Sequence, residues 1–461
     1  MAYGRLRQIW HTDNWNTKRA QVCKWEEEDQ EERRKALVGN RIVDARLNPR
    51  RLWDLVSNRV VPWWCLGVDW ICRHPLSFRP ISHAWMDEKD RANAWTPING
   101  YEWPAPMPKN ANLKLIRIEM LNLGAEYTWL DILCLRQEGG PGEHMRTEEW
   151  KLDVPTIGAV YDDDNEVVCY LSGLGRPFNF SLKEGDLDSD RSWFRRAWTL
   201  QEIGKSRVIA GDTPDGPMHA ERKDGKYETK LLNRFHKQWE SMDDVQYDVF
   251  GALQSMQKRV STNPVDKVAG LASVMQSSFI PAYYESESLE DAWTALVNSM
   301  QDWCRGQLFF LCPEPGNTGK KWRPSWDQVM MPLVYDHFPA VEVGRDETRN
   351  EDSCASWCIE GLVRGLAVVE EGDRRGQLIV KGKGRKRHSF KITAAHTYPI
   401  PEDTYTLIDA CSELESPHTG WIVGRSLPGG MFEKVSVLEA WSLEEWVKLD
   451  GNAEERRYIL I

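Results

Sequence analysis

The residue with the clearest potential for chemistry is Glu202, near the end of SDRSWFRRAWTLQEIGKSRVIAG at 189–211. This segment has the pattern of an amphipathic helix, with Ser189 or Asp190 as its N-cap and Gly204 at its end, followed by a strand. Glu202 would then lie near the helix C-terminus, where the macrodipole disfavours a negative charge. We therefore expect a compensating group: an arginine, a structural hydrogen bond, or a function for the carboxylate.

A second carboxylate, Asp131, interrupts the apolar run YTWLDILCL at 127–135. This run predicts a strand that is buried on both faces, where an unpaired charge is expensive. An ion pair with Arg195 or Arg196 is one interpretation, and a role in a ligand site is the other.

Ser82 and His83 belong to a short apolar run, PISHAW at 80–85. Their adjacency does not make them a nucleophile and its base, so they are either strand-end hydrogen-bonding groups or ligand contacts. The chain has no phosphate-binding Gly-x-x-x-x-Gly-Lys-Ser/Thr loop and no His-Glu-x-x-His zinc motif. The nucleophile-elbow pattern fails around Ser172, because Tyr170 stands where a glycine is required.

The elements that must position these residues alternate between strand and helix patterns from residue 76 to 211. Strands are expected at 80–85, 127–135, 166–171 and 207–210, with helices at 110–124, 150–161 and 189–204. This order predicts an α/β fold, a parallel sheet with helices on both faces. Ligands bind such sheets outside the carboxyl ends of the strands.

A chain of 461 residues is long enough for about two to four domains. The pattern of charge, tryptophan and alternation predicts a helical and Trp-rich appendage at 1–75, the α/β domain at 76–275, a helical and loop connection at 276–345, and an antiparallel β domain at 346–461. The appendage is either a packed lid or a partner surface. The basic turn at 381–388 is interpreted as a solvated hairpin tip.

Composition excludes several classes of protein. The net charge of −11 argues against a chain that mainly coats phosphates, so no nucleic-acid partner is expected. The most apolar stretch, 60–72, is too short to cross a membrane and contains Asp69, and the N-terminus has no signal-peptide pattern. We expect a soluble, cytoplasmic protein whose scattered cysteines are reduced thiols, with no metal site and no cofactor.

Three blocks now carry a resemblance: PISHAWM at 80–86, YTWLDILCLRQ at 127–137 and SWFRRAWTLQE at 192–202. Together and in this order they resemble the signature blocks of the fungal heterokaryon-incompatibility (HET) domain. PVDKVAGL at 264–271 and WRPSWDQ at 322–328 resemble segments that commonly follow. The chain departs from the family pattern at Met86, where glycine is frequent, and in the second block at Leu135 and Arg136. Both departures fall at strand ends, where a substrate loop would lie.

The resemblance implies a role in fungal non-self recognition and regulated cell death. It also implies remote kinship with Toll/interleukin-1 receptor (TIR) domains, some of which cleave NAD, and hence a TIR- or flavodoxin-like sheet. Enzymatic TIR domains carry a glutamate in a block resembling Trp-Cys-Leu-x-Glu-Leu, which here reads WTLQEI at 198–203. The match assigns Glu202 the catalytic position, and NAD would be the substrate.

The same resemblance suggests substrate contacts. Trp85 or Trp198 would stack on the nicotinamide or adenine ring, and Arg195 or Arg196 would meet the pyrophosphate. Ser82 and His83 would bond the ribose or a phosphate, while Asp131 would lie beside them. Each has a structural alternative: Glu202 would be an arginine-paired strut, Trp198 a core residue, Asp131 a buried ion-pair partner, and Ser82 and His83 strand-end hydrogen-bonding groups.

Two function hypotheses therefore stand. In the first, the chain is an enzyme that hydrolyses NAD and kills or arrests the cell by depleting it. In the second, it is a non-enzymatic signalling and self-association module, and the partners that it recruits cause death. Glu202 in its local block favours the first hypothesis. The altered residues after the first two strands favour the second.

Overall fold

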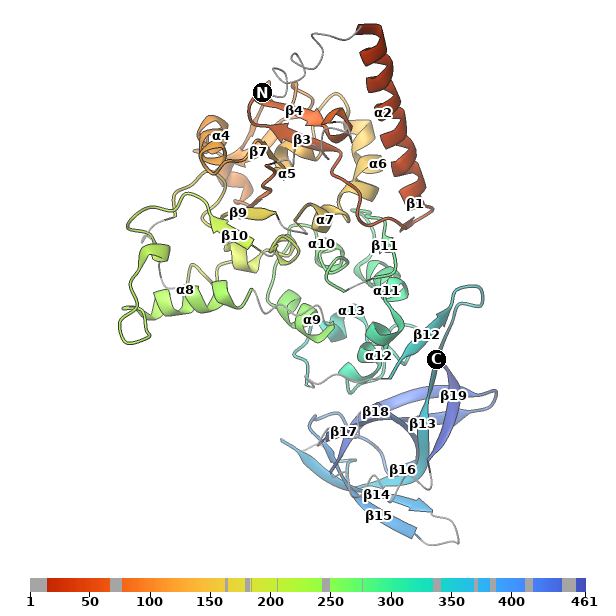
Figure 1. Ribbon diagram of the computed structural model, residues 1–461. Helices are drawn as coiled ribbons and strands as arrows, with labels where there is room; N and C mark the ends of the chain where they lie inside the picture. Colours follow the sequence, from red (N-terminus) through yellow and green to blue (C-terminus); the bar gives the residue numbers. More distant parts are fainter. Residues whose placement is uncertain are drawn as a thin grey trace. The chain divides into compact units, whose positions relative to one another are not determined.

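The computed structural model describes residues 15–66, 77–161, 165–178, 183, 185–204, 206–242, 249–275, 277–334, 341–368, 372–381, 387–410, 418–441 and 453–461 (Figure 1). The chain divides into two compact units. The first contains Met1–Val245 and Lys258–Ser288, and the second contains Gln246–Gln257 and Leu289–Ile461. The boundaries at 75, 275 and 345 suggested by the sequence divide the chain more finely and stay predictions.

The first unit mixes helices with short strands. Its helices are α2 (Trp15–Ala36), α4 (Leu113–Asn122), α5 (Asp131–Cys134), α6 (Glu143–Asp153), α7 (Ile157–Tyr161), α8 (Lys230–Glu240) and α10 (Asp266–Ala269). Its strands are β1 (Leu37–Val38), β2 (Arg41–Ile42), β3 (Arg51–Asp54), β4 (Arg59–Pro62), β5 (Ile81–His83), β6 (Arg91–Ala94), β7 (Ala105–Pro108), β8 (Tyr127–Thr128), β9 (Glu166–Tyr170), β10 (Ser206–Ile209) and β11 (Ile280–Pro281). Short 3₁₀ helices complete it: η1 (Trp63–Leu66), η2 (Glu88–Asp90), η3 (Trp193–Arg195), η4 (Trp198–Leu200) and η5 (Pro217–His219).

The predicted parallel sheet is present. Strands β5, β9 and β10 pair in parallel in the order β10–β9–β5. The chain that leads into β5 also runs parallel to β8, because the amides of Arg79 and Ile81 donate to the carbonyls of Tyr127 and Trp129. Strand β8 thus lies on one side of β5, and β9 followed by β10 lies on the other side. The four consecutive residues from Val167 to Tyr170 of β9 are buried, so both faces of this part of the central strand are covered.

Helix α4 follows its sequence pattern. The side chain of Asn112 caps the helix by accepting from the amide of Lys114, and Leu113, Ile116 and Met120 are buried. Gly124 adopts a positive φ of 85° just beyond the end.

Three expected elements are different. The helix expected at 150–161 is divided into α6, which ends at Asp153, and α7, which begins at Ile157. The strand predicted at 127–135 is short, because β8 ends at Thr128 and helix α5 begins at Asp131. The single helix predicted at 189–204 is wrong: the segment forms η3 and η4, and Arg196 between them is extended, with φ −80° and ψ 137°. The extended residue lies where Val260 pairs with the chain, so tertiary hydrogen bonds replace the helical ones there. Gly204 still has a positive φ, of 60°.

The N-terminal segment is packed through ion pairs. Arg50 bonds to Asp153 at 2.7 Å, and Arg51 bonds to Glu149 at 2.7 Å, so the start of β3 is fixed to helix α6. Residues 67–76, which include part of the predicted apolar run, lie outside the described residues. In the described part, β3 and β4 form an antiparallel hairpin that continues the pairing through β8.

The second unit joins helices to an antiparallel β domain, as the sequence predicts. The helices are α9 (Val249–Gln257), α11 (Leu289–Ser299), α12 (Asp302–Leu311) and α13 (Trp326–Val329). The strands are β12 (Val343–Asp346), β13 (Glu351–Arg364), β14 (Arg374–Lys381), β15 (Arg387–Ala394), β16 (Asp403–Asp409), β17 (His418–Leu427), β18 (Met431–Trp441) and β19 (Glu454–Leu460). The basic tip at 382–386 lies outside the described residues.

The strands of this domain close on themselves. Strands β13, β14, β15, β18, β17 and β16 pair in that order, and β16 pairs back to β13, which makes a barrel without an open edge between them. Its interior is filled by apolar side chains, including Phe390, Tyr405 and Trp421. Across the residues that the structure describes, no helix is both long and apolar enough to span a membrane.

Candidate functional site

The predicted site residues meet at the carboxyl edge of the parallel sheet. Ser82 and His83 end strand β5, which pairs with β9 in the register Ser82 to Cys169. Asp131 follows β8, and Glu202 follows η4 just before strand β10. Carboxyl ends of parallel strands share one edge, which explains how residues up to 120 positions apart become neighbours.

A hydrogen-bond chain orients Glu202. The indole N–H of Trp193 donates to Oγ of Ser82 at 2.7 Å, and Ser82 Oγ donates to Oε2 of Glu202 at 2.6 Å. Because the indole can only donate, the serine hydroxyl must direct its own proton to the carboxylate. This chain holds one carboxylate oxygen of Glu202 in a fixed direction.

Opposing effects determine the pKa of Glu202. Burial raises the pKa of Glu202 to about 7, and the charge of Asp131 acts in the same direction. The hydrogen bond from Ser82 and the charges of His83 and Arg196 oppose this rise. In the described part of the chain no cationic side chain forms an ion pair with Glu202, and the residue remains partly exposed. Glu202 is therefore not the arginine-paired strut that the sequence allowed.

His83 and Asp131 form a second pair at the same edge. Nε2 of His83 lies 2.9 Å from Oδ1 of Asp131, and the indole N–H of Trp85 donates to Oδ2 at 3.0 Å. Burial alone would lower the pKa of His83, but the charge of Asp131 and its hydrogen bond raise it. Burial likewise opposes ionisation of Asp131, yet His83 and the amide of Ile132 bring the pKa of Asp131 below its usual value. The pair is thus an imidazolium with a carboxylate over a range of pH.

The expected partners of Asp131 were wrong. Asp131 begins helix α5 and accepts from the amide of Ile132 at 2.7 Å, so it is not inside a strand. Arg195 pairs with Asp190 at 3.3 Å, and Arg196 donates to Oγ1 of Thr262 at 3.3 Å. The early end of β8 turns Asp131 toward His83, which takes the place of an arginine.

The two tryptophans proposed as ring platforms differ. Trp85 is partly exposed, stacks on His83 with 5.8 Å between ring centroids, and has the guanidinium of Arg91 5.1 Å from its ring. Trp198, also partly exposed, lies 6.5 Å from the ring of Tyr283, whose hydroxyl donates to Asp266 at 2.8 Å. The first contributes to the edge that carries His83 and Asp131. The second is anchored in packing with helix α10 and the chain after β11.

Arg136, one of the residues at which the chain departs from the HET-domain blocks that it resembles, has a structural role. Arg136 is buried, pairs with Glu149 at 3.3 Å and with Glu102 at 3.2 Å, and lies 5.0 Å from the ring of Trp103. Arg51 approaches the same ring at 5.2 Å. Arg136 therefore anchors the chain after α5 and does not point to a ligand.

Three residues near Glu202 escaped the sequence analysis. Trp193 donates its indole proton to Ser82, a bond that helical spacing does not indicate. Tyr161 donates to the carbonyl of Ile81, and the charge of Glu202 contributes to the raised pKa of its buried phenol. Arg259 is buried and electrostatically coupled to Glu202, but no local motif marks it.

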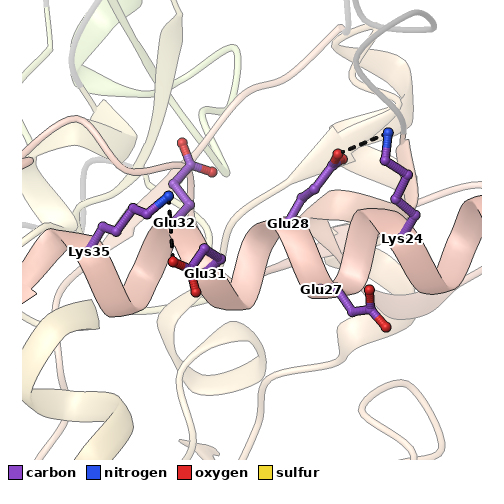
Figure 2. A pocket seen from close by; sticks show the side chains of 6 residues that line it. All are labelled: Lys24, Glu27, Glu28, Glu31, Glu32 and Lys35. Carbon is purple, nitrogen blue, oxygen red and sulfur yellow. Dashed lines mark ion pairs between the residues drawn. The ribbon is translucent and has the colours of Figure 1, made fainter.

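A hollow elsewhere in the first unit has no such organisation. It lies along helix α2 and is lined only by charged side chains: Lys24, Glu27, Glu28, Glu31, Glu32 and Lys35 (Figure 2). Lys24 pairs with Glu28 at 3.3 Å and Lys35 with Glu31 at 3.5 Å, and these side chains are largely exposed. This is a solvated helix face, as is usual for a dense run of charged residues.

Within the described ranges, no cluster of three or more His, Cys, Asp or Glu side chains could hold a metal ion. Comparison of the chain with protein families, with curated proteins and with solved structures found no match. A proposal for function therefore starts from the carboxylate of Glu202. Ser82 orients this carboxylate, and among the described residues it has no ion-pair partner.

Proposed function

We propose that this chain is a HET-domain protein of fungal non-self recognition that hydrolyses NAD through a TIR-like site centred on Glu202. The observation that supports the proposal most is the state of Glu202 itself. It is partly exposed at the carboxyl edge of a parallel sheet, oriented by Ser82, and has a pKa raised to about 7. Perturbed carboxylates at such edges are typical of functional sites.

The fold and the sequence blocks support the same proposal. The parallel strands follow the order second, first, third, fourth, which is the order of flavodoxin-like sheets. Each of the three resemblance blocks contributes to the site: Ser82 and His83 from the first, Asp131 from the second, and Glu202 from the third. Segments that are separate in the sequence therefore converge on one group of contacts.

The proposed reaction breaks the bond between ribose C1′ and the nicotinamide nitrogen. The bonding electrons leave with nicotinamide, positive charge develops on the ribose, and water adds at C1′ and loses a proton to give ADP-ribose. An anionic Glu202 would stabilise this oxocarbenium-like charge. Ser82 keeps the carboxylate in one orientation, and the partly exposed ring of Trp85 offers a stacking surface for a base.

A non-enzymatic signalling and self-association module remains the second candidate. One observation favours it: the chain from Trp193 through Ser82 occupies an oxygen of Glu202, as it would in a structural brace. In this case the carboxylate would fix the segment between η4 and β10, and recruited partners would cause death. Cytoplasmic action is part of both proposals.

The deciding experiment measures nicotinamide release by the purified full chain incubated with NAD, at high protein concentration and with a crowding agent. We expect release by the wild type and a loss of at least about 100-fold in Glu202→Gln, because the charge that stabilises the transition state is removed. Glu138→Gln changes an exposed glutamate and is the matched control. A wild type that releases no nicotinamide would contradict the enzyme. A Glu202→Gln chain that still causes cell death would favour the signalling module.

A further inference from the structure

The segment that leads to Glu202, residues 193–204, is held by hydrogen bonds to Arg259 and Val260. The amide of Val260 donates to the carbonyl of Arg195 at 2.6 Å, and the amide of Ala197 donates to the carbonyl of Val260 at 2.9 Å. These bonds bracket Arg196, which is the extended residue between η3 and η4. Isolated 3₁₀ turns have few and poorly aligned hydrogen bonds of their own, so the position of this segment depends on such contacts.

Arg259 provides the side-chain part of this arrangement. Only 3% of the residue is exposed, and its Nη1 donates to the carbonyl of Arg196 at 2.7 Å and to Oγ1 of Thr199 at 2.6 Å. The hydroxyl of Thr199 lies in turn 2.7 Å from the carbonyl of Trp193, to which it can donate. One guanidinium nitrogen thus links η3, the extended residue and η4. The planar fork of arginine suits several acceptors at once.

Arg259 also interacts electrostatically with Glu202. Among the described residues no carboxylate forms an ion pair with Arg259, and its hydrogen-bond acceptors are neutral. Burial lowers the pKa of Arg259 to about 10, and the charge of Glu202 opposes this effect. Since the interaction between two charges is mutual, the guanidinium favours the ionised form of Glu202.

We infer that Arg259 is a positioning residue for Glu202: it fixes the η3–η4 segment, which leads directly to Glu202, through Thr199 and the carbonyl of Arg196. The catalytic part of this inference rests on the proposed NAD hydrolysis. Its structural part does not, because the hydrogen bonds can be tested in an inactive chain.

The test compares Arg259→Met and Arg259→Lys with the wild type, all as full chains. The matched control is Lys258→Met, which removes the exposed cation next in sequence. Hydrogen exchange of peptides covering 193–204 reports the position of the segment. The kcat and KM for NAD, measured across pH, report the carboxylate.

We expect Arg259→Met to accelerate exchange in 193–204 by at least about tenfold. It should also lower kcat by at least about tenfold with KM changed by less than about threefold, and move the pH midpoint of kcat upward. Arg259→Lys should recover most of the pH midpoint but not the exchange protection, because lysine restores the charge without the fork. Lys258→Met should match the wild type in all measurements.

Unchanged exchange in Arg259→Met would overturn the inference whether or not the chain is an enzyme. Lost protection with an unchanged kcat would also overturn it, by leaving Arg259 a purely structural role. If the wild type releases no nicotinamide, the proposed function fails separately, while the exchange measurement still decides whether Arg259 positions the segment. Should Arg259→Met fail to fold, Arg259→Lys supplies the same comparison, and exchange equal to that of the wild type would then count against the inference.

Discussion

Two buried polar groups, Glu202 at the sheet edge of the first unit and Lys434 in the barrel of the second, have different kinds of hydrogen-bond partner. In the barrel unit, Nζ of Lys434 donates to the carbonyls of Phe309 and Cys312, each at 2.7 Å. At the sheet edge, the side chains bond to one another, Ser82 to Glu202 and His83 to Asp131.

The difference lies in what a change of protonation does. A backbone carbonyl always accepts, so the contacts of Lys434 fix the end of helix α12 on strand β18 and have no alternative state. A carboxylate can accept as an anion or donate as an acid, so the contacts of Glu202 can change while the backbone stays in place. The contacts of Lys434 are thus suited to stability, and those of Glu202 to chemistry.

The largest expected effect on stability is that of Lys434→Met, which tests the barrel half of this comparison. Burial lowers the pKa of Lys434 to about 8 from the usual value of 10.5. Between these two pH values the unfolded chain binds more protons than the folded chain, so the free energy of unfolding increases with pH over this range. The substitution should abolish this rise, about 3 kcal/mol, and leave two carbonyls unpaired. Denaturant unfolding at pH 7 and 10 measures it. Lys391→Met, on the exposed side of β15, should behave like the wild type.

Asp131→Asn should have the next largest effect, about 2 kcal/mol at pH 5.5. The pKa of His83 is raised, so its contribution to stability is complete below pH 6.5 and is lost as pH rises through the raised value. The pKa of Asp131 is lowered, so its contribution is lost only as pH falls through that lowered value.

The loss in Asp131→Asn should therefore be greatest between about pH 4 and 6.5 and smaller at pH 9. Melting temperatures across this range measure it. Asp87→Asn, which breaks the exposed pair with Arg191, should cost less than about 1 kcal/mol. Equal melting temperatures for Asp131→Asn and the wild type at pH 5.5 would show that the His83 pair does not stabilise the fold.

A smaller effect is expected from Ser82→Ala, which separates orientation from charge at the sheet edge. The hydrogen bond from Ser82 lowers the pKa of Glu202, so its removal should raise that pKa above 7 by about one unit. If nicotinamide release requires the anion, its pH midpoint should rise with it. The other groups that influence Glu202 are His83, Asp131, Arg196, Tyr161 and Arg259. An unchanged midpoint would mean that another group controls the pH profile.

The smallest effect should come from Gln257→Ala. This substitution tests whether a change at the end of helix α9 alters hydrogen exchange in residues 193–204. Gln257 ends helix α9 and donates to the carbonyls of Val329 and Met331 at 2.8 and 2.6 Å, within the second unit. Arg259 follows two residues later in the first unit. We expect hydrogen exchange in 193–204 to accelerate by about threefold or less, because the bonds of Arg259 remain. Exchange identical to that of the wild type would indicate that the anchoring of α9 does not reach Glu202.

Sequence patterns predicted the elements that depend on local periodicity and capping. The buried face of α4, the parallel strands β5, β9 and β10, and the antiparallel strands after residue 346 all follow this logic. They also placed Ser82 and His83 at the end of a strand, whereas Asp131 was expected inside one. Parallel strands bring their carboxyl ends together, and the early end of β8 is what adds Asp131 to that edge.

The sequence failed where long-range bonds override local propensity. The helix predicted at 189–204 gives way to η3 and η4, because Val260 and Arg259 offer acceptors and donors that compete with helical bonding. Asp131 lost its expected arginine because β8 ends early, which sets the carboxylate against His83.

The sequence by itself determined which residue types could act and roughly where along the strands they would stand. Only the tertiary structure decided their partners and their charge: Trp193 through Ser82 orients Glu202, and burial shifts its pKa. The physical reason is that the free energy of a buried charge depends on dipoles and charges within a few ångströms, and these come from segments that are far apart in the chain.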